Sequence, residues 1–367
     1  MNTSNERFDN YKFYAYLCTP MHIYSSPITC SIVGARGYSG LEIARILLKH
    51  PAVKLETCFA TQNFSLSQYL SNPLAQTIPC LPDSEIMNHL SDVVFLATPA
   101  EVSLELAPKI LEKGKKVIDV SGAFRLKKND YKKWYGFEHN QKNLLDCAVY
   151  GLQPWQNLHK NTALVANPGC YATAISLALI PLLKNELIKT DNISIDAKSG
   201  TSGAGRKASE NMLFTEVDGE CLPYKVGMHQ HTPEILETIE MFSGVQVDPH
   251  FTTSLLPTRR GIIAGIYAQV SPTIGLEQIE KAFQNAYANY PLIQFTNLNK
   301  NSELLKLKKV VGTANCHISY QLIDQKLYLF SCIDNLLKGA ASQAVENFNA
   351  IYQLPITTGL EWMEALT

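Results

Sequence analysis

The stretch Ile28-Thr29-Cys30-Ser31-Ile32-Val33-Gly34-Ala35-Arg36-Gly37-Tyr38-Ser39-Gly40 decides the fold of this chain. Its first six residues are an apolar run with the length of a buried strand, and its glycine-rich end leads into a helix pattern from Leu41 to Lys49. A strand, a glycine turn and a helix in this order are typical of a dinucleotide-binding unit, in which the pyrophosphate lies on the helix N-terminus. The residues of this turn that we expect to bind the cofactor are Gly34, Arg36, Gly37, Tyr38, Ser39 and Gly40.

The next strand, Val53 to Ala60, indicates which dinucleotide is bound. An NAD site places an Asp or Glu at the end of this strand to hold the ribose hydroxyls, but here the strand leads into Thr61-Gln62 without a carboxylate. Arg36 in the glycine turn is available for a 2′-phosphate instead. The sequence therefore favours NADP(H) over NAD(H), and we expect Thr61 and Thr98 to lie at the same site.

Strands and helices continue to alternate up to about residue 121. Asp92 to Thr98 is a second buried run, Glu101 to Lys113 is a helix pattern that Gly114 ends, and Val117 to Ser121 is the next strand. The polar, proline-punctuated region 63–88 between them predicts mostly loop. This alternation predicts a doubly wound parallel sheet, and we assign residues 28–169 to a Rossmann-type NADP-binding domain.

A candidate nucleophile lies in Leu164-Val165-Ala166-Asn167-Pro168-Gly169-Cys170-Tyr171-Ala172-Thr173. The stretch begins as a short strand, turns at Asn167-Pro168-Gly169 and continues into an apolar run long enough for a buried helix. Cys170 is expected within the first two residues of that helix. Unpaired N–H groups and the helix dipole at this position predict a lowered thiol pKa and a reactive thiolate, whereas the alternative is an inert, buried cysteine.

Two further polar stretches are candidate site residues. Ser199 to Lys207 reads as an exposed loop whose hydroxyls, N–H groups and cations suit a phosphate, the alternative being a flexible linker. In Met228-His229-Gln230-His231 the two histidines project to one side if the segment is extended, the alternative being two surface histidines. Thr232 is a plausible N-cap with Pro233 at the first helical position, so the backbone of His231 is held better than that of His229. His231 is therefore the preferred acid–base, with His229 as its partner.

The remaining pattern predicts an α+β second domain, residues 170–335, with a mixed and largely antiparallel sheet. A helix is expected at Leu276 to Tyr290. Strands are expected at Ile193–Ala197, Phe251–Leu256, Ile262–Val270, Val311–Gln321 and Lys326–Ile333. Residues 336–367 are expected to hold a helix, from about Ser342 to Tyr352, that returns to the nucleotide domain.

Composition excludes several classes of protein. The 367 residues are 46% hydrophobic with a net charge of −1, without a basic patch or an apolar run long enough to span a membrane, so we expect neither nucleic acid nor membrane as a partner. The nine scattered cysteines predict reduced thiols and a cytoplasmic location, and the histidines lack zinc-ligand spacing, so we expect no metal. Residues 1–27 are interpreted as an N-terminal extension rather than a transit peptide.

From about Ile28 onward the sequence resembles the N-acetyl-γ-glutamyl-phosphate reductase family of arginine biosynthesis, within the aspartate-semialdehyde-dehydrogenase-like superfamily. The most specific similarity is Val165 to Ala174, with Ala178, Leu179 and Pro181 where the family signature expects them. The other similar motifs, in family order, are Gly34–Glu42, Asp119–Arg125, Val149–Leu152, Ser199–Lys207, His229–Ile235 and Asp334–Ala341.

The resemblance implies a role for several residues. Cys170 would be the nucleophile and one histidine of the pair the acid–base. The cofactor residues would include Ser202, Gly203 and Asn335, and the substrate residues Arg125, Ser199, Arg206 and Glu234. The chain departs from the family pattern at Gln153-Pro154, where relatives usually carry a glutamate close by, and at Ser254, where they tend to carry histidine.

The implied reaction is reduction of an acyl phosphate to a semialdehyde through a Cys170 thioester, by a homo-oligomer (dimer or tetramer) formed through the second domain. Three alternatives remain. A reductase of aspartyl phosphate or of a carrier-bound aminoadipyl phosphate would use the same chemistry with a different pocket. A non-catalytic NADP-binding regulatory protein would keep the fold, and a thiol acyltransferase would need no nucleotide.

Overall fold

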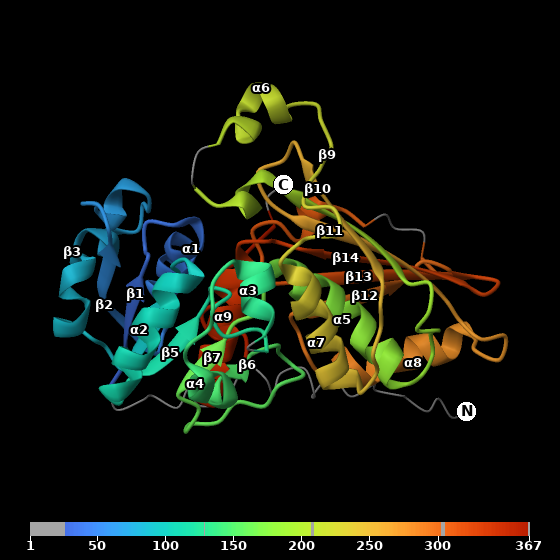
Figure 1. Cartoon of the computed structure of the whole chain (residues 1–367), viewed down its shortest axis with the longest axis horizontal. Coiled ribbons are helices and arrows are strands. Elements are labelled where there is room, and N and C mark those ends of the chain that lie inside the picture. The colour runs from blue at the N-terminus through green and yellow to red at the C-terminus, as the bar shows by residue number, and fades with distance from the viewer. Residues whose placement is uncertain (1–25, 128, 207–208, 302–304, 366–367) are drawn as a thin grey trace, which may run out of the picture.

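The structure is a computed structural model that describes residues 26–127, 129–206, 209–301 and 305–365 (Figure 1). Two seven-stranded sheets lie side by side, one built from the N-terminal half and one from the C-terminal half of the chain. The N-terminal extension lies outside the described residues except for Ser26 and Pro27, and so do Lys207 of the predicted anion loop and residues 366–367.

All strands of the first sheet are parallel, in the order β3-β2-β1-β4-β5-β7-β6. The predicted doubly wound sheet is therefore confirmed, and the strand order reverses at β1, where ligands bind in such sheets. Its strands are β1 (Ile28–Val33), β2 (Val53–Ala60), β3 (Cys80–Pro82), β4 (Val93–Leu96), β5 (Lys116–Asp119), β6 (Val149–Tyr150) and β7 (Leu164–Ala166). Its helices are α1 (Tyr38–Leu47), α2 (Ala100–Glu112), α3 (Asp130–Tyr135) and α4 (Lys142–Cys147).

The first helix begins earlier than the prediction at Leu41. Gly37 is extended (φ −69°, ψ 162°) and caps α1, so Tyr38, Ser39 and Gly40 form its first turn. Gly40 is required there because a Cβ would lie 2.4 Å from the carbonyl oxygen of Gly34. The glycine turn and the helix start are thus one compact unit.

The second sheet is mixed, in the order β12-β13-β14-β11-β8-β10-β9, and four of its six neighbouring pairs are antiparallel, as predicted. Helix α5 packs on β11 and β14 and is covered by α7, which explains why its residues from Tyr171 to Leu183 are buried on every side. The strands are β8 (Ser194–Gly200), β9 (Leu222–Pro223), β10 (His250–Leu256), β11 (Ile262–Gln269), β12 (Ile293–Asn297), β13 (Cys316–Ile323) and β14 (Lys326–Ile333). The helices are α5 (Cys170–Lys184), α6 (Phe214–Val217), α7 (His231–Ser243) and α8 (Leu276–Tyr287).

Several predicted boundaries in this half are wrong. β13 starts at Cys316 rather than Val311, because residues 307–309 form a 3₁₀ turn and Thr313 caps the approach to the strand. Helix α8 ends at Tyr287, before Pro291. β8 continues through Ser199, which pairs with Leu255 and with Ile262, so Ser199 is buried rather than part of an exposed loop.

The chain then returns to the first sheet through a π-helix, Leu337–Ala341, and α9 (Ser342–Ile351). α9 contacts α1 and β5 and is seen in red among the strands of the first sheet in Figure 1. Its buried side chains are unusually polar, and buried polar groups require hydrogen-bond partners. Two of these groups pair with other elements: Glu346 Oε2 accepts from Lys338 Nζ of the π-helix (2.5 Å), and Asn349 Oδ1 lies 3.0 Å from His50 Nε2.

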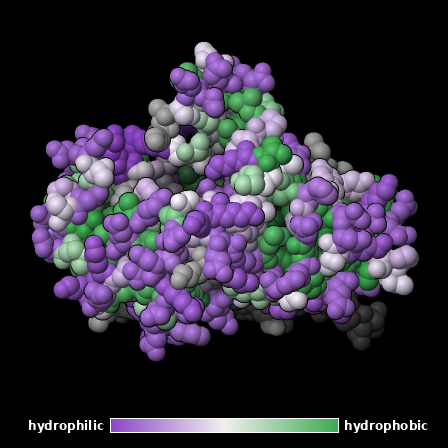
Figure 2. Space-filling model, viewed as in Figure 1, coloured by the Kyte–Doolittle hydropathy of each residue, from purple (hydrophilic) through white to green (hydrophobic). Residues whose placement is uncertain are grey.

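An arm, residues 209–228, projects from the second domain between β8 and α7 and carries α6 and β9 (Figure 1, top). It exposes apolar side chains to solvent, among them Leu213 at 53% and Phe214 at 75%, and Figure 2 shows green atoms on it. Met212 and Leu213 of the arm also line a cleft against α1. The arm is therefore the outer wall of the space between the two domains.

Candidate active site

Cys170 is the first residue of α5, immediately after β7 and its turn, as predicted. The turn is held by Asn167, whose Nδ2 donates to the carbonyl of Ala340 (3.1 Å) and whose Oδ1 accepts from Asn347 Nδ2 (3.0 Å). Gly339 packs against the other side, where a Cβ would lie 2.6 Å from the Cβ of Cys170. The returning C-terminal segment therefore fixes the cysteine from behind.

A buried ion pair lies beside the start of α5. Arg125 Nε donates to the carbonyl of Asn167 (2.7 Å), and its Nη1 lies 3.5 Å from Glu234 Oε2. The other oxygen of Glu234 accepts from the N–H of Gly169 (2.7 Å) and from the hydroxyl of Tyr150 (2.8 Å). Glu234 is fully buried, so it holds the turn and Arg125 in place rather than facing solvent.

The histidine pair adopts a different geometry from the one predicted. Helix α7 begins at His231, and Thr232 is not its N-cap; the N–H of Thr232 donates to the carbonyl of His229 (2.9 Å) in a turn, not an extended segment. The N–H of His231 is capped by the ring of His229, whose Nδ1 accepts it at 3.1 Å. Both imidazoles still lie together, with ring centres 4.9 Å apart.

His231 and Arg125 converge on the residue before the cysteine. A Cβ at Gly169 would lie 2.6 Å from His231 Nε2 and 2.9 Å from Arg125 Nη1. His229 is set back from this point, in edge-to-face contact with Tyr171, Tyr224 and Phe251. The geometry thus brings His231 to the start of α5 and packs His229 behind it.

Burial controls the ionisation of these groups. It raises the pKa of the Cys170 thiol to about 11, while Arg125 and the backbone N–H groups of α5 act in the opposite direction. The predicted lowering of the thiol pKa is therefore wrong for this state. Burial and the charge of Arg125 lower the pKa of His231 to about 3, and burial and His231 lower that of His229 to about 2. Both imidazoles are neutral at pH 7, the form that accepts a proton.

A second feature is a cleft of about 350 Å³ between α1 and the second domain, visible as a hollow below the arm in Figure 2. Tyr38 and Glu42 line it from α1, and Ser202, Arg206 and Arg260 line it from the other side. The glycine turn at its edge fits a dinucleotide: Gly34 has φ +81° and lies so close to the backbone of Ala97 that a Cβ would be 2.3 Å from its carbonyl oxygen.

The other predicted cofactor residues lie at the carboxyl edge of the first sheet or next to Ser202, which lines the cleft. Thr61 follows β2 and Thr98 follows β4, at the carboxyl edge of the parallel sheet, and Thr98 shares a hydrogen bond with Ser103 (2.8 Å). Asn335 follows β14, and its Nδ2 donates to Ser202 Oγ (3.0 Å). Gly203 comes next in the same 3₁₀ turn as Ser202.

The other two predicted substrate residues differ in position: Ser199 hydrogen-bonds to the side chain of Tyr171, next to Cys170, whereas Arg206 contacts the glycine turn. Arg206 Nη1 donates to the carbonyl of Arg36 (2.8 Å), and its guanidinium lies 4.8 Å from the ring centre of Tyr69. Arg206 therefore faces the glycine turn of the nucleotide domain. Ser199 donates to the carbonyl of Gly200 (3.0 Å) from within β8.

Where the chain departs from the family pattern, the structure shows buried polar residues. Gln153 donates to Asn347 Oδ1 (3.4 Å), and Ser254 lies in the middle of β10. The residues that sequence reasoning missed include Asn347, Arg260 and Glu42. Asn347 carries no signal in the sequence, because Ala344, Val345, Phe348 and Ile351 form an ordinary apolar stripe on its helix, and the opposite, polar side has the pattern of a solvent-facing one. The signal for Arg260 would have been its place directly before Gly261 and a strand.

Across the ranges that the structure describes, no three His, Cys, Asp or Glu side chains gather as a metal-ligand set. A search of the same ranges finds no helix with both the length and the apolarity needed to cross a bilayer.

Comparison with known proteins gives two family models that divide the chain as the sheets do. The semialdehyde dehydrogenase NAD-binding domain matches residues 29–163, and the semialdehyde dehydrogenase dimerisation domain matches residues 170–335. N-acetyl-γ-glutamyl-phosphate reductase of Brevibacillus brevis is 39% identical over 91% of this chain and 98% of its own, and that of Clostridium botulinum is 40% identical over the same shares.

The chain belongs to the N-acetyl-γ-glutamyl-phosphate reductase family. The resemblance seen in the motifs is therefore confirmed, and so is the assignment of the first sheet to a nicotinamide dinucleotide. Among solved structures, aspartate semialdehyde dehydrogenase II of Vibrio cholerae has the same fold, with a TM-score of 0.68 over 90% of this chain and 99% of that one at 17% identity.

Proposed function

We propose that this chain reduces N-acetyl-γ-glutamyl phosphate with NADPH to N-acetylglutamate 5-semialdehyde and phosphate, in arginine biosynthesis. Family membership supports the reaction. The observation that carries the assignment of residues is the convergence of His231 and Arg125 on Gly169, directly before Cys170. A thiol, a neutral imidazole and a guanidinium at one helix start are the groups that acyl transfer through a thioester needs.

Cys170 is the nucleophile. Its thiol is protonated in the free enzyme, so neutral His231 takes the proton as the sulfur approaches the acyl carbonyl. A bond then forms between sulfur and the acyl carbon, the bond from that carbon to the phosphate oxygen breaks, and phosphate leaves. The bound NADPH supplies the hydride that converts the thioester to the aldehyde level.

His231 and the start of α5 stabilise the negative charge that develops on the acyl oxygen. N–H groups in the first turn of a helix lack intrahelical acceptors and can share an oxyanion, and Arg125 adds a positive charge beside them. When the hemithioacetal collapses, His231 removes its hydroxyl proton, the bond from the carbon to the sulfur of Cys170 breaks, and the semialdehyde leaves. His229 orients His231 by capping its N–H.

The cofactor residues are those of the cleft between α1 and the second domain. Gly34, Gly37 and Gly40 let the pyrophosphate approach the backbone, and Ser202 and Asn335 close the site from the second domain. NADP(H) is preferred because the exit from β2, Thr61-Gln62, carries no carboxylate and Arg36 is near. Arg206 joins this site rather than the substrate site, since it donates to the carbonyl of Arg36.

The test is oxidation of N-acetylglutamate 5-semialdehyde by purified protein in the presence of NADP and phosphate. Turnover that requires phosphate and that Cys170→Ser abolishes supports the proposal. Faster turnover of aspartate semialdehyde, or of a carrier-bound aminoadipate semialdehyde, would assign a related acyl phosphate as substrate. Fast alkylation of Cys170 at neutral pH would count against the non-catalytic regulatory protein, and acyl transfer that NADP(H) does not affect would favour the acyltransferase.

Self-association through the open face of the second sheet completes the proposal. Residues alternate along β11 and β14, so Tyr267, Tyr328 and Phe330 lie on the face opposite α5, where their rings contact one another at 6.1 to 6.3 Å. Tyr267 is 38% exposed, an unusual place for an aromatic patch unless it is covered by another subunit. We assign a dimer or a dimer of dimers built on this face, in the cytoplasm, where the free cysteines of the described chain stay reduced.

A further inference from the structure

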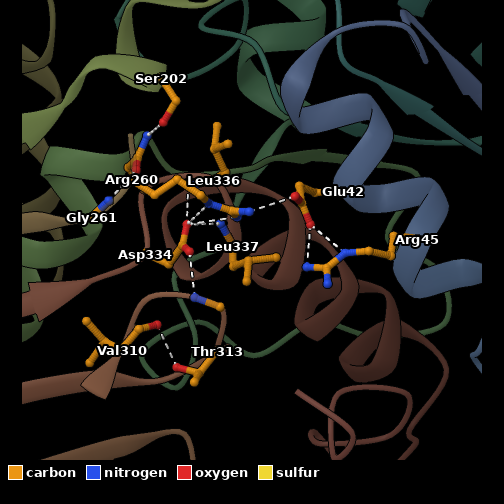
Figure 3. Close-up of polar contacts among 12 residues, drawn as sticks. Glu42, Arg45, Ser202, Arg260, Gly261, Val310, Thr313, Asp334, Leu336 and Leu337 are labelled. Atoms are coloured by element: carbon orange, nitrogen blue, oxygen red, sulfur yellow. Dashed lines mark hydrogen bonds and ion pairs between the residues drawn. The ribbon is translucent and has the colours of Figure 1, made fainter. Parts of the chain in front are cut away.

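A chain of charged side chains crosses from the nucleotide domain to the second domain along the cofactor cleft (Figure 3). Arg260, two residues before β11, donates through Nη1 to Glu42 Oε1 of α1 (2.8 Å). Its Nη2 and Nε both donate to Asp334 Oδ1, at 3.1 and 3.3 Å. Glu42 also pairs with Arg45 in the next turn of α1 (2.8 Å).

The side chain of Asp334 is fully buried, and its hydrogen bonds fix the backbone at the end of β14. Its Oδ1 accepts the N–H groups of Leu336 (2.8 Å) and Leu337 (3.2 Å), and its Oδ2 accepts the N–H of Gly312 (2.9 Å). The carboxylate therefore shapes the start of the π-helix, and Arg260 is the cation that balances it. A buried carboxylate left without its cation carries a large desolvation penalty.

The same segment holds Asn335, the residue after Asp334. Asn335 Oδ1 accepts the N–H of Gly261 (2.8 Å), and its Nδ2 donates to Ser202 Oγ (3.0 Å). Arg260 therefore binds the side chain of Asp334, and the N–H of Gly261 binds that of Asn335. Glu42 connects α1 to the same group through its ion pair with Arg260. Moving Arg260 would move the amide of Asn335 relative to the glycine turn.

Arg260 also sets the net charge of the group of side chains at this edge of the cleft. Glu42, Arg45, Arg260 and Asp334 carry two negative and two positive charges, so the group is neutral at the edge of a cleft that receives an anionic dinucleotide. Without Arg260 the group has a net charge of −1, and solvent ions screen that charge weakly because Glu42 is largely buried and Asp334 fully buried.

We infer that Arg260 is a positioning residue for NADPH, which neutralises Glu42 and Asp334 and holds Asn335 in register with the glycine turn. The inference rests on the proposed use of NADPH, but its test measures cofactor binding, not turnover. Loss of the N-acetylglutamate semialdehyde reaction in the wild type would defeat the proposed function alone.

The experiment is titration of the full-length protein with NADPH, followed by the fluorescence of the nicotinamide, for wild type, Arg260→Gln, Arg260→Lys, Glu42→Gln and the double variant Glu42→Gln/Arg260→Gln. Arg260→Gln should weaken NADPH binding by roughly tenfold, a difference of about 1.4 kcal/mol in binding free energy. Arg260→Lys should recover most of the affinity. The double variant should bind more tightly than Arg260→Gln, because removal of the Glu42 charge restores neutrality.

Arg259→Gln is the matched control, since Arg259 lines the same cleft one residue away. Glu42→Gln should recover less affinity in an Arg259→Gln background than in an Arg260→Gln background. Equal recovery would overturn the inference, because it would reflect only the overall charge of the cleft. NADPH binding by Arg260→Gln within twofold of wild type, with an unchanged thermal unfolding midpoint, would overturn it as well, and so would Arg260→Lys binding as weakly as Arg260→Gln.

If Arg260→Gln does not fold, Arg260→Lys carries the test, since it keeps a cation beside the buried carboxylate of Asp334. Arg260→Lys should then fold and bind NADPH within a few fold of wild type, and a tenfold loss of affinity in this folded variant would overturn the inference. The alkylation rate of Cys170 by iodoacetamide should be the same in every folded variant, because the bridge lies at the cofactor cleft, and a change there would show that Arg260 acts through general packing instead.

Discussion

Gly169→Ala isolates the convergence on which the assignment of the active site depends. The backbone of Gly169 is extended (φ −73°, ψ 156°), a conformation open to alanine, so the change does not strain the chain. The added Cβ, however, would lie 2.6 Å from His231 Nε2, where ordinary contacts begin at 3.4 Å. The imidazole must retreat by about 0.8 Å, and a displacement near 1 Å costs on the order of 10²-fold in rate. We expect turnover to fall by about 10²-fold.

The matched control is Gly275→Ala. Gly275 is also an extended N-cap glycine (φ −105°, ψ 173°), but of α8, and a Cβ there would only reach Gln278 Oε1 at 3.6 Å. Both variants lose the same N-cap preference, so they should lose similar stability from that source, and Gly169→Ala should lose about 1–3 kcal/mol more from overpacking. The assay is steady-state turnover with thermal unfolding. Turnover of Gly169→Ala within twofold of Gly275→Ala would refute the placement of His231 at the reacting centre.

Four further outcomes are expected. Cys170→Ser should fold normally and lose all but a few per cent of turnover, measured as NADP reduction. Because burial raises the pKa of Cys170 to about 11, the thiolate fraction and hence the iodoacetamide alkylation rate should rise about tenfold per pH unit between roughly pH 7 and 10; a plateau below pH 8 would contradict this. His231→Asn should slow single-turnover hydride transfer by ~10²–10⁴-fold and His229→Asn by less, and the reverse order would exchange their roles. NADPH should bind much more tightly than NADH, and Arg36→Gln should narrow the difference; equal dissociation constants in the wild type would count against the 2′-phosphate contact.

The sequence predicts the sheets of this protein well because their strands are buried runs. β2 and β14 match the predicted bounds, and the glycine turn places the first domain within a known architecture. Cys170 at the start of α5 follows from Pro168 and Gly169, since these residues punctuate the chain and an apolar run follows them. Local pattern and tertiary packing agree in these segments, and there the prediction succeeds.

The site departs from the sequence rules where tertiary contacts replace local ones. Thr232-Pro233 has the form of a helix start, but α7 begins at His231 because the ring of His229 caps it, a task that rules for Ser, Thr, Asp and Asn do not assign to histidine. The thiol pKa rises because burial outweighs the helix dipole, and burial cannot be read from a cysteine's neighbours in the chain. Arg206 lies on the glycine turn, about 170 positions away, by a contact that only the fold creates.

Because α9 covers part of the first sheet, the nucleotide domain can be completed only after nearly the whole chain has been synthesised. His50, just after α1, meets Asn349, which lies 299 positions later in the chain. The ribosome therefore completes β1 to β7, the cysteine turn and the whole second sheet before the segment that fills the nucleotide half appears. Until then the apolar residues under α9, such as Phe95 and Val165, have no cover from it. Contacts of such long range form late, and the nascent nucleotide half is exposed to aggregation for most of translation.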